Sequence, residues 1–372
     1  MRFRKVPWIL RFDFPLMAAA ITLLLIGLVM VYSASTPMAL KKFADPNHYA
    51  LRNIVYASLG IFAMFLVSMA PIKVIRKAGV TLFWICLLML LVVLIPGLGL
   101  RGGGAQRWIN FGLFTIQPTE PFKVALVLFT AHFLAMDPSR ALRIRGGLLP
   151  LLLLYGFAAM LMLREPDFGS TVISGAVLMG IIFVGGIPIS WIAGLLMAAI
   201  PAAAAGVIMA PYRFARVTSF LDPWDDPLDS DFQLAQSLMA FGNGGFLGRG
   251  LGQGQQKHLY LPEAHTDFIL AVIAEEMGFI LVGLIILLFA FIVWRAFKIA
   301  QRHEEPFARL ACSGLAMLLG FQTVANMGVV MGLLPPKGLT LPLISYGGSS
   351  LIITMCSIGL LLAFSRHPYD QA

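Results

Sequence analysis

Residues 261–294 read LPEAHTDFILAVIAEEMGFILVGLIILLFAFIVW, an almost unbroken apolar stretch preceded by three ionisable side chains, Glu263, His265 and Asp267. A run of roughly 20 apolar residues is long enough to cross the hydrocarbon core of a membrane as an α-helix. A carboxylate at the mouth of such a helix is costly, because charges at bilayer depth usually face a cavity or a partner. This stretch therefore predicts a membrane-spanning helix with a functional site at its start.

The composition extends this prediction to the whole chain. Of 372 residues, 59% are hydrophobic and only 12% are charged, and the mean hydropathy is +0.86. A water-soluble globule could not cover that much apolar surface with polar side chains. The apolar runs are continuous rather than alternating, which favours helices over barrel strands. We predict an all-α polytopic membrane protein that forms a single domain over residues 1–372.

Ten segments are apolar and long enough to be predicted as membrane-spanning helices. They are residues 14–34, 54–72, 79–96, 119–136, 147–163, 168–186, 188–210, 267–294, 307–331 and 346–365. The first is long and ends without a small-residue cleavage site, so we interpret it as a retained anchor rather than a signal peptide. An even number of spans places both termini on the same side.

The loops between these segments divide the charges unevenly. Those on the side of the termini carry 15 Lys or Arg against 5 Asp or Glu, whereas the others carry 12 against 13. Basic residues favour the cytoplasmic side, so both termini are predicted to be cytoplasmic. The net charge of +9 then reflects topology and anionic lipid. The sequence contains no basic run with interleaved aromatic residues, so it does not indicate nucleic acid as a partner.

One long extracytoplasmic loop, residues 211–266, separates predicted helices 7 and 8, and loops of such length are usually functional. Phe232, Ala235, Leu238 and Met239 recur at helical spacing in it, which predicts a short amphipathic helix at the outer leaflet. Aspartates between positions 222 and 231 fit no EF-hand register, so capped turns are favoured over a calcium site. The seven glycines between positions 242 and 254 favour a connector that allows close approach over a phosphate cradle.

Two further outward segments carry charged side chains. A helix that begins near Thr119 sets Glu120 and Lys123 one turn apart, which favours a structural ion pair over a catalytic acid. Residues 333–350 are too rich in proline and glycine for a regular helix, so their backbone must be buried in protein or line a wet cavity. Lys337 in this segment suits an anionic phosphate, and a lysine that only extends its stem along the membrane surface is the alternative.

The spacing of Glu263, His265 and Asp267 also raises the question of a metal. Alternate residues in a turn seldom converge on one ion, and a zinc site would need further His or Cys ligands nearby. A structural zinc is therefore not expected. A magnesium ion held by one carboxylate and substrate phosphates stays open.

Several of these strings, in fixed order along nearly the whole chain, resemble the SEDS family (shape, elongation, division, sporulation). They are Tyr32 to Ser35, Arg107 to Ile109, Ile116 to Lys123, Glu165 to Gly169, Tyr212 with Arg213 and Arg216, Trp224 to Pro227, Gln233 with Gln236 to Leu238, Leu261 to Phe268, Glu275 to Gly278, and Lys337 to Ser350. The run from Lys337 is similar to the division branch, the FtsW proteins, since the elongation paralogue RodA typically lacks that lysine. The departures at Phe232, Met277 and Pro336 touch none of the charged positions.

This resemblance implies a SEDS fold and a peptidoglycan glycosyltransferase that polymerises lipid II at the septum, in the bacterial cytoplasmic (inner) membrane. It implies Asp267 as the catalytic residue. The residues that it places at the substrate are Arg107, Arg213, Arg216, Gln236, Glu263, His265, Lys337 and Ser345. The implied partners are a class B penicillin-binding protein transpeptidase of the FtsI type and other divisome membrane proteins. No organic cofactor is expected, whereas Mg²⁺ or another divalent cation stays a candidate.

The reaction needs a base at the acceptor hydroxyl and positive charge at the departing diphosphate. We assign the base to Asp267 and the charge to Lys337, Arg213 and Arg216. Glu275 and Glu276 lie roughly 12 Å deeper along a helix rising about 1.5 Å per residue, so they are structural or gating candidates.

Three other functions use the same charges. They are a lipid II flippase or transporter, a division scaffold without turnover, and the elongation role of the RodA paralogue. A transporter should carry charges through its depth, whereas polar residues here crowd the outer third of the predicted bundle. That asymmetry favours chemistry at the surface.

Overall fold

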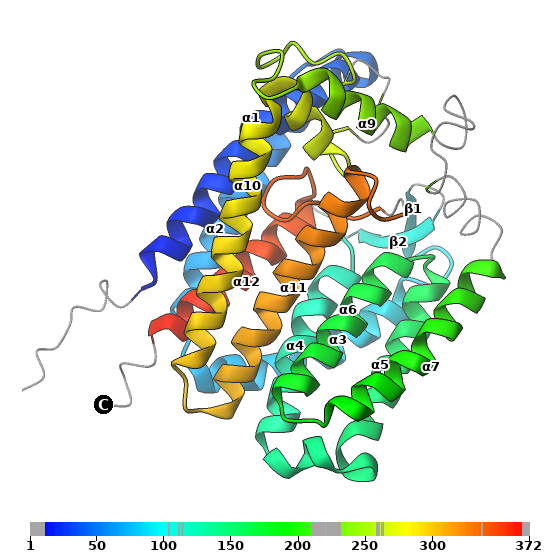
Figure 1. The fold of residues 1–372 in the computed structure, drawn as a ribbon, viewed down its shortest axis with the longest axis vertical. Helices are drawn as coiled ribbons and strands as arrows, with labels where there is room; N and C mark the ends of the chain where they lie inside the picture. Colours follow the sequence, from blue (N-terminus) through cyan, green and yellow to red (C-terminus); the bar gives the residue numbers. More distant parts are fainter. Residues whose placement is uncertain are drawn as a thin grey trace, which may run out of the picture.

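A computed structural model describes residues 12–102, 105–110, 112, 115–209, 220, 232–257, 261, 264–335 and 338–366. The long helices are α1 (Phe14–Phe43), α2 (His48–Ser68), α3 (Ile72–Val92), α4 (Thr119–Ala135), α5 (Leu149–Arg164), α6 (Phe168–Val184), α7 (Ile189–Ile208), α10 (Ile269–Gln301), α11 (Pro306–Val330) and α12 (Gly348–Arg366). The shorter elements are β1 (Gly99–Gly102), β2 (Ala105–Asn110), β3 (Thr115–Ile116), η2 (Pro138–Leu142), η3 (Ile144–Leu148) and α9 (Phe232–Gly244). A helix lies at each of the ten segments predicted to span a membrane (Figure 1).

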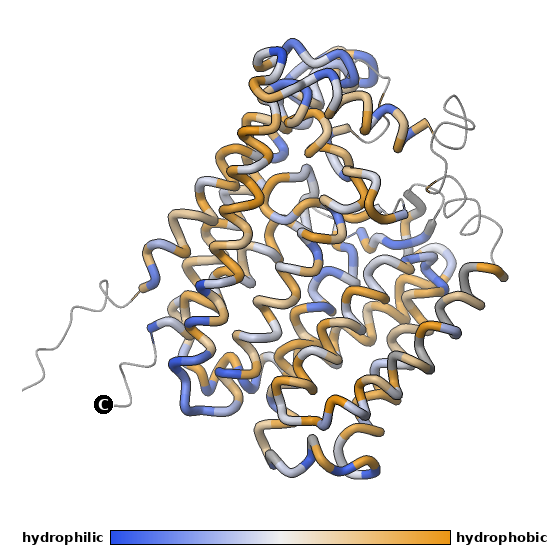
Figure 2. Tube along the Cα trace, in the orientation of Figure 1, coloured by the Kyte–Doolittle hydropathy of each residue, from blue (hydrophilic) through white to orange (hydrophobic). Residues whose placement is uncertain are grey.

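Length and hydropathy support a membrane protein. Within the described ranges, seven helices are long and apolar enough to cross a bilayer, and α6 is a shorter apolar helix. Large apolar side chains such as Phe62 and Leu66 on α2 and Leu88 on α3 are at least 60% exposed, which suits contact with lipid tails. Figure 2 shows hydrophobic colour along the helices and hydrophilic colour at the two ends of the bundle.

Three helices extend beyond their apolar windows. The sequence predicts an end of α1 near residue 34, but α1 continues to Phe43, with Lys41 and Lys42 in its last turn. α2 and α3 likewise begin earlier than predicted, at His48 and Ile72. Hydropathy detects only the part of a helix that lipid covers, whereas backbone hydrogen bonds continue the helix into polar surroundings.

The segment before α4 departs from the all-helical prediction. β1, β2 and β3 form a small antiparallel sheet in that order, with Leu100 opposite Trp108 and Ile109 opposite Ile116. The register shifts between Leu100 and Arg101. Strands this short, interrupted by glycines and a bulge, have too weak a period to be recognised in the sequence.

α11 and α12 occupy the centre of the bundle. In the apolar windows of these two helices 67% and 72% of the residues are buried, more than in the other five described helices that are long and apolar enough to cross a bilayer. α11 packs against α10, α4 and α6, and α12 packs against α2. A Cβ on Gly359 of α12 would lie 2.5 Å from the Met64 carbonyl oxygen of α2, so only glycine permits this approach.

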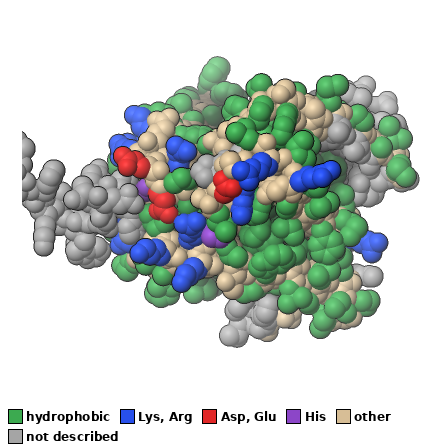
Figure 3. Space-filling model, turned by 90° about the horizontal axis from the view of Figure 1, so that it is seen from below, with side chains coloured by type: hydrophobic (Ala, Val, Ile, Leu, Met, Phe, Trp, Pro, Cys, Tyr) green, Lys and Arg blue, Asp and Glu red, His purple; other side chains and the backbone are tan. Residues whose placement is uncertain are grey.

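The bundle has two distinct ends. We call the end at which the described chain begins and ends the lower end; there the Asp13 amide donates to Ser365 Oγ, and Arg366 donates to the Met69 carbonyl. Figure 3 shows this end with Lys and Arg side chains spread across it and a few acidic side chains among them. The upper end carries α9, the sheet and the residues between α11 and α12 (Figure 1).

α10 is broken at Gly278, where φ is +74° and ψ is −178°. Residues 245–257, which we call the inserted loop, supply the hydrogen bonds that the break removes. Gly245 and Phe246 carbonyls accept from the amides of Phe279 and Ile280. In return the amides of Arg249 and Gly250 donate to the Glu275 and Glu276 carbonyls. A helix inside a membrane must satisfy its backbone groups within protein, and this exchange does so.

Candidate active site

Asp267 lies two residues before α10, at the upper end of the bundle. Residues 264–268 form a turn, and Ile269 is the first helical residue. The side chain is partly exposed, and the positive end of the helix dipole favours its negative charge. A Cβ on Gly338 would lie 3.3 Å from Asp267 Oδ2, so the bare backbone of residue 338 lies beside the carboxylate.

The residues that follow Gly338 are fixed to the Asp267 segment by hydrogen bonds. Asn326 of α11 donates from Nδ2 to the Asp267 carbonyl, at 2.9 Å, and to the Leu339 carbonyl. The Tyr346 amide donates to the His265 carbonyl at 3.0 Å. These contacts clamp residues 338–346 across the start of α10.

His265 belongs to a group of aromatic rings at the upper end. The residue is only 5% exposed. The ring centroid lies 4.8 Å from that of Tyr49 and 5.5 Å from that of Tyr346. The packing of these rings links α2 to the turn that precedes α10 and to the segment that precedes α12. Within the described residues, no cluster of three or more His, Cys, Asp or Glu side chains is arranged to hold a metal ion.

Arg107, on β2, is held by the turn between α5 and α6. Its Nε donates to the Glu165 carbonyl at 2.8 Å and its Nη2 to the Pro166 carbonyl at 2.6 Å. Asp167 caps α6 by accepting from the Ser170 amide, and Gln117 Nε2 donates to its other oxygen. The guanidinium thus shapes this turn, at the same end as Asp267.

Glu165 is a buried carboxyl group in that turn. Neither of its oxygens has a hydrogen-bond partner among the described residues. Burial first, and the Asp167 carboxylate second, raise the pKa of Glu165 to about 9, against the opposing charge of Arg107. Its side chain therefore carries a proton at neutral pH.

The other sequence-predicted residues divide into those that the structure describes and those that it does not, and the described ones are considered first. The expected ion pair is present, with Lys123 Nζ 2.8 Å from Glu120 Oε1 and both side chains buried. Ser345 is buried and its hydroxyl accepts from the Leu341 amide, so it shapes its own turn. Gln236 is buried on α9, the helix predicted within the long loop.

Four predicted site residues lie outside the described residues. They are Arg213, Arg216, Glu263 and Lys337. The aspartates between positions 222 and 231, weighed above as calcium ligands, also lie outside them.

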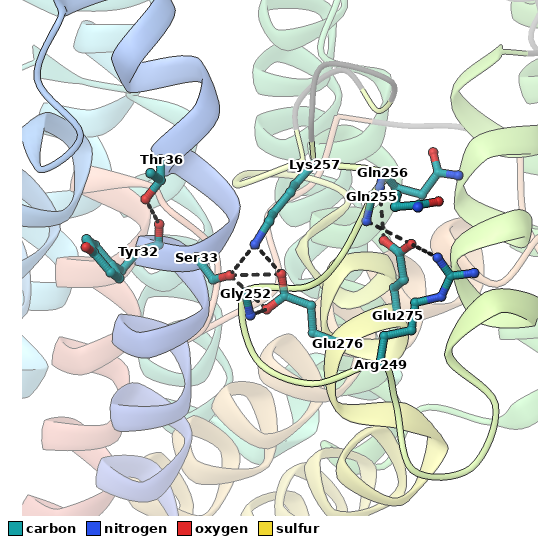
Figure 4. Close-up of polar contacts among 10 residues, drawn as sticks. All are labelled: Tyr32, Ser33, Thr36, Arg249, Gly252, Gln255, Gln256, Lys257, Glu275 and Glu276. Atoms are coloured by element: carbon teal, nitrogen blue, oxygen red, sulfur yellow. Dashed lines mark hydrogen bonds and ion pairs between the residues drawn. The ribbon is translucent and has the colours of Figure 1, made fainter.

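Sequence reasoning named Glu276 as a structural or gating candidate but missed the buried charge cluster that it forms with Lys257 and Ser33 (Figure 4). Lys257 Nζ lies 2.6 Å from Glu276 Oε1 and donates to Ser33 Oγ at 2.9 Å. The Ser33 hydroxyl in turn donates to Glu276. Ser33 and Glu276 both lie in strings that carried the family resemblance, but nothing in the spacing of either string shows that they meet.

An apolar groove of about 320 Å³ lies far from Asp267, between η3, α5 and α7. It is lined by Ile144, Leu148, Leu149, Leu152, Trp191, Gly194 and Leu195. It contains no side chain that could act as an acid, base or nucleophile. The chemistry of the upper end therefore defines the candidate site.

Known sequences match this chain over nearly its whole length. Residues 14–370 match the FtsW, RodA and SpoVE family of cell cycle proteins. A probable peptidoglycan glycosyltransferase FtsW of Geobacter sp. (strain M18) is 43% identical over 356 residues, which cover 96% of this chain and 97% of that protein. The stage V sporulation protein E of Bacillus subtilis (strain 168) is 40% identical over 355 residues, 95% of this chain and 97% of that protein.

Solved structures give the same result. A chain from a peptidoglycan synthase complex that coordinates polymerization and crosslinking superposes with a TM-score of 0.80 at 31% identity, covering 96% of this chain and 99% of its own length. The rod shape determining protein RodA of Thermus thermophilus superposes with a TM-score of 0.68 at 30% identity, covering 96% and 98%.

Proposed function

Because the chain belongs to the FtsW, RodA and SpoVE family of cell cycle proteins, we propose that it is a peptidoglycan glycosyltransferase that polymerises lipid II, with Asp267 as its general base. The activity follows from relatives above 40% identity over nearly the full chain that carry this activity in their names. The position of Asp267 beside Gly338 is the observation that supports its role as the base.

The proposed reaction joins two sugars with inversion. The 4-hydroxyl oxygen of an acceptor N-acetylglucosamine attacks the anomeric carbon of the donor sugar and forms the β-glycosidic bond. The bond from that carbon to undecaprenyl diphosphate breaks, and the diphosphate leaves with the electron pair. Asp267 takes the hydroxyl proton as the nucleophile attacks.

The leaving diphosphate requires positive charge, which Lys337, Arg213 and Arg216 supply in this proposal. Arginine binds phosphate through two parallel hydrogen bonds, which suits this role. A divalent cation such as Mg²⁺ would be held by a single carboxylate and the substrate phosphates, because the described residues offer no cluster of protein ligands. When bound, it would add charge stabilisation at the diphosphate.

The partner and the cellular site also belong to this proposal. The superposed synthase complex coordinates polymerization with crosslinking. A class B penicillin-binding protein of the FtsI type therefore suits this chain as the crosslinking partner, together with other divisome membrane proteins. We place the chain at the septum of the cytoplasmic membrane with both termini cytoplasmic, on the basis of the loop charges and of the FtsW relatives.

Polymerisation of lipid II tests the proposal directly. The purified protein with its crosslinking partner, given lipid II, should form glycan strands, and Asp267→Asn should lower the rate by about 100-fold or more, because asparagine cannot accept a proton. The variant should keep its fold and its partner, as shown by co-purification. Polymer formation at the wild-type rate by Asp267→Asn would refute the role of Asp267.

The same preparation separates the flippase alternative. If the protein were a flippase, vesicles containing either the wild type or Asp267→Asn would move labelled lipid II between leaflets, and neither protein would form polymer. Strand formation by the wild type alone identifies an enzyme.

A further inference from the structure

The two buried glutamates of α10 hold the inserted loop by separate sets of contacts (Figure 4). Glu276 accepts from Lys257, from Ser33 and from the Gly252 amide. Glu275 accepts from the amides of Gln255 and Gln256, each at 3.0 Å. Both carboxylates are 0% exposed. Every contact except that of Ser33, from α1, reaches the inserted loop.

The backbones also meet without space for side chains. A Cβ on Gly248 would lie 2.2 Å from the Glu276 carbonyl oxygen, and a Cβ on Gly278 would lie 2.3 Å from the Phe246 carbonyl oxygen. Gly244 makes an equally close approach to the Ala274 carbonyl. The inserted loop and the upper half of α10 therefore form one closely packed unit.

This unit leads directly to the candidate base. Gln256, held by Glu275, accepts at its carbonyl from the Leu261 amide at 2.9 Å. Leu261 is buried and lies six residues before Asp267. Asp267 in turn lies eight residues before Glu275. The chain runs from Asp267 into α10 and reaches Glu275, which binds Gln256. Gln256 binds Leu261, and the chain leads from Leu261 back to Asp267, so that two hydrogen bonds close a ring.

We propose that Glu275, Glu276 and Lys257 are positioning residues that hold Asp267 in place through the inserted loop; this rests on the proposed function of Asp267. Burying an ion pair is weak evidence for stability, because desolvation offsets the attraction between the charges. A buried ion pair can instead favour one conformation of the surrounding backbone over the alternatives, and this is the role that we assign to Lys257 and Glu276. A general base must lie within hydrogen-bond reach of the hydroxyl, and a displacement of about 1 Å far from the chemistry can lower a rate about 100-fold.

The chain offers a matched control at the other end of the same two helices. Asp13 at the start of α1 pairs with Arg295 of α10, at 2.6 Å between Oδ2 and Nη2. Like the Ser33–Glu276 contact, it joins α1 to α10, but it lies at the lower end and touches no part of the inserted loop. A variant there weakens the same helix pair without displacing Asp267.

Steady-state polymerisation by the complex with its crosslinking partner tests the proposal, with rates expressed per folded molecule by size-exclusion chromatography. Glu276→Gln and Lys257→Met should each lower kcat about 10- to 100-fold while the KM for lipid II changes less than about twofold. Lys257→Arg, which keeps the charge, should restore most of the rate. Asp13→Asn should lower the thermal midpoint and leave kcat unchanged.

Two outcomes would overturn the inference. One is a folded Glu276→Gln protein with the wild-type kcat. The other is an equal loss of kcat in Asp13→Asn, which would mean that only helix packing matters. If Glu276→Gln fails to fold, Glu275→Gln, which leaves the Lys257–Glu276 ion pair intact, is measured against the same criteria.

Asp267→Asn in the same assay separates this inference from the proposed function. If Asp267→Asn polymerises normally, the proposed function fails whatever the other variants do. If Asp267→Asn is inactive and Glu276→Gln is fully active, only the positioning role fails.

Discussion

The two ends of the α1–α10 pair use charge in different ways. At the lower end, Asp13 meets Arg295 across the helices, and the Arg295 side chain keeps 19% of its surface exposed. At the upper end, Lys257 and Glu276 are 5% and 0% exposed, and Lys257 of the inserted loop contacts both helices, through Ser33 and Glu276. The lower pair fastens two helices, whereas the upper cluster fixes a loop onto a broken helix. Within this pair of helices, the more deeply buried charges therefore lie where the backbone of α10 departs from a regular helix.

The largest difference in the free energy of unfolding is expected between two variants that each remove one basic side chain, one at each end of the α1–α10 pair. Lys257→Met leaves Glu276 buried without its charge partner, which should lower the free energy of unfolding by about 3–5 kcal/mol. Arg295→Met should cost less, about 1.5–3 kcal/mol, because the lower pair is less buried, with the Arg295 side chain 19% exposed against 5% for Lys257. Equilibrium unfolding in mixed micelles, followed by circular dichroism, measures both. Equal losses would mean that the two ends do not differ as described.

A pair of glycines in the inserted loop sharpens the comparison. Gly248 and Gly252 have similar φ values, +78° and +83°, but only Gly248 lies against the backbone of α10. Gly252→Ala should cost about 1–2 kcal/mol, from the left-handed backbone alone. Gly248→Ala should cost a further 1–3 kcal/mol, approximately, from overpacking. The same unfolding assay checks this, and identical costs would contradict a close-packed insertion.

Glu165 gives the upper end a pH dependence. Its pKa is raised from 4.5 to about 9, so the folded state holds a proton that the unfolded chain releases above pH 4.5. Stability should therefore fall as pH rises between these two values and then level off. Glu165→Gln, which is neutral at every pH, should remove this fall. Thermal midpoints between pH 5 and about 9 should diverge in favour of the variant, and parallel curves would contradict the assignment.

The smallest effect is expected beyond the break in α10. Gly283 lies in the regular lower part of the helix, and nothing lies within 4 Å of a Cβ added there. Gly283→Ala should stabilise the protein by about 0.5–1 kcal/mol, because alanine loses less backbone freedom in a helix. A loss of stability at this position would show that the lower half is packed as closely as the upper half.

Sequence reasoning was most successful where the signal is local. The ten predicted segments each contain a helix, the residues with helical spacing from Phe232 to Met239 lie on α9, and Glu120 pairs with Lys123 one turn away. Helical contacts three or four residues apart follow from the period of the helix itself. The short sheet was missed because strands of two to six residues do not establish a period.

The sequence by itself determined that this is a helical membrane protein whose charges gather before α10, because hydropathy and spacing depend on neighbours along the chain. Only the tertiary structure decided that Ser33 meets Lys257 and Glu276, 224 and 243 residues away, and that Gly338 lies beside Asp267. It also decided that α10 breaks at Gly278, where a loop takes over its hydrogen bonds. These contacts depend on how distant segments pack, and hydropathy carries no information about that packing.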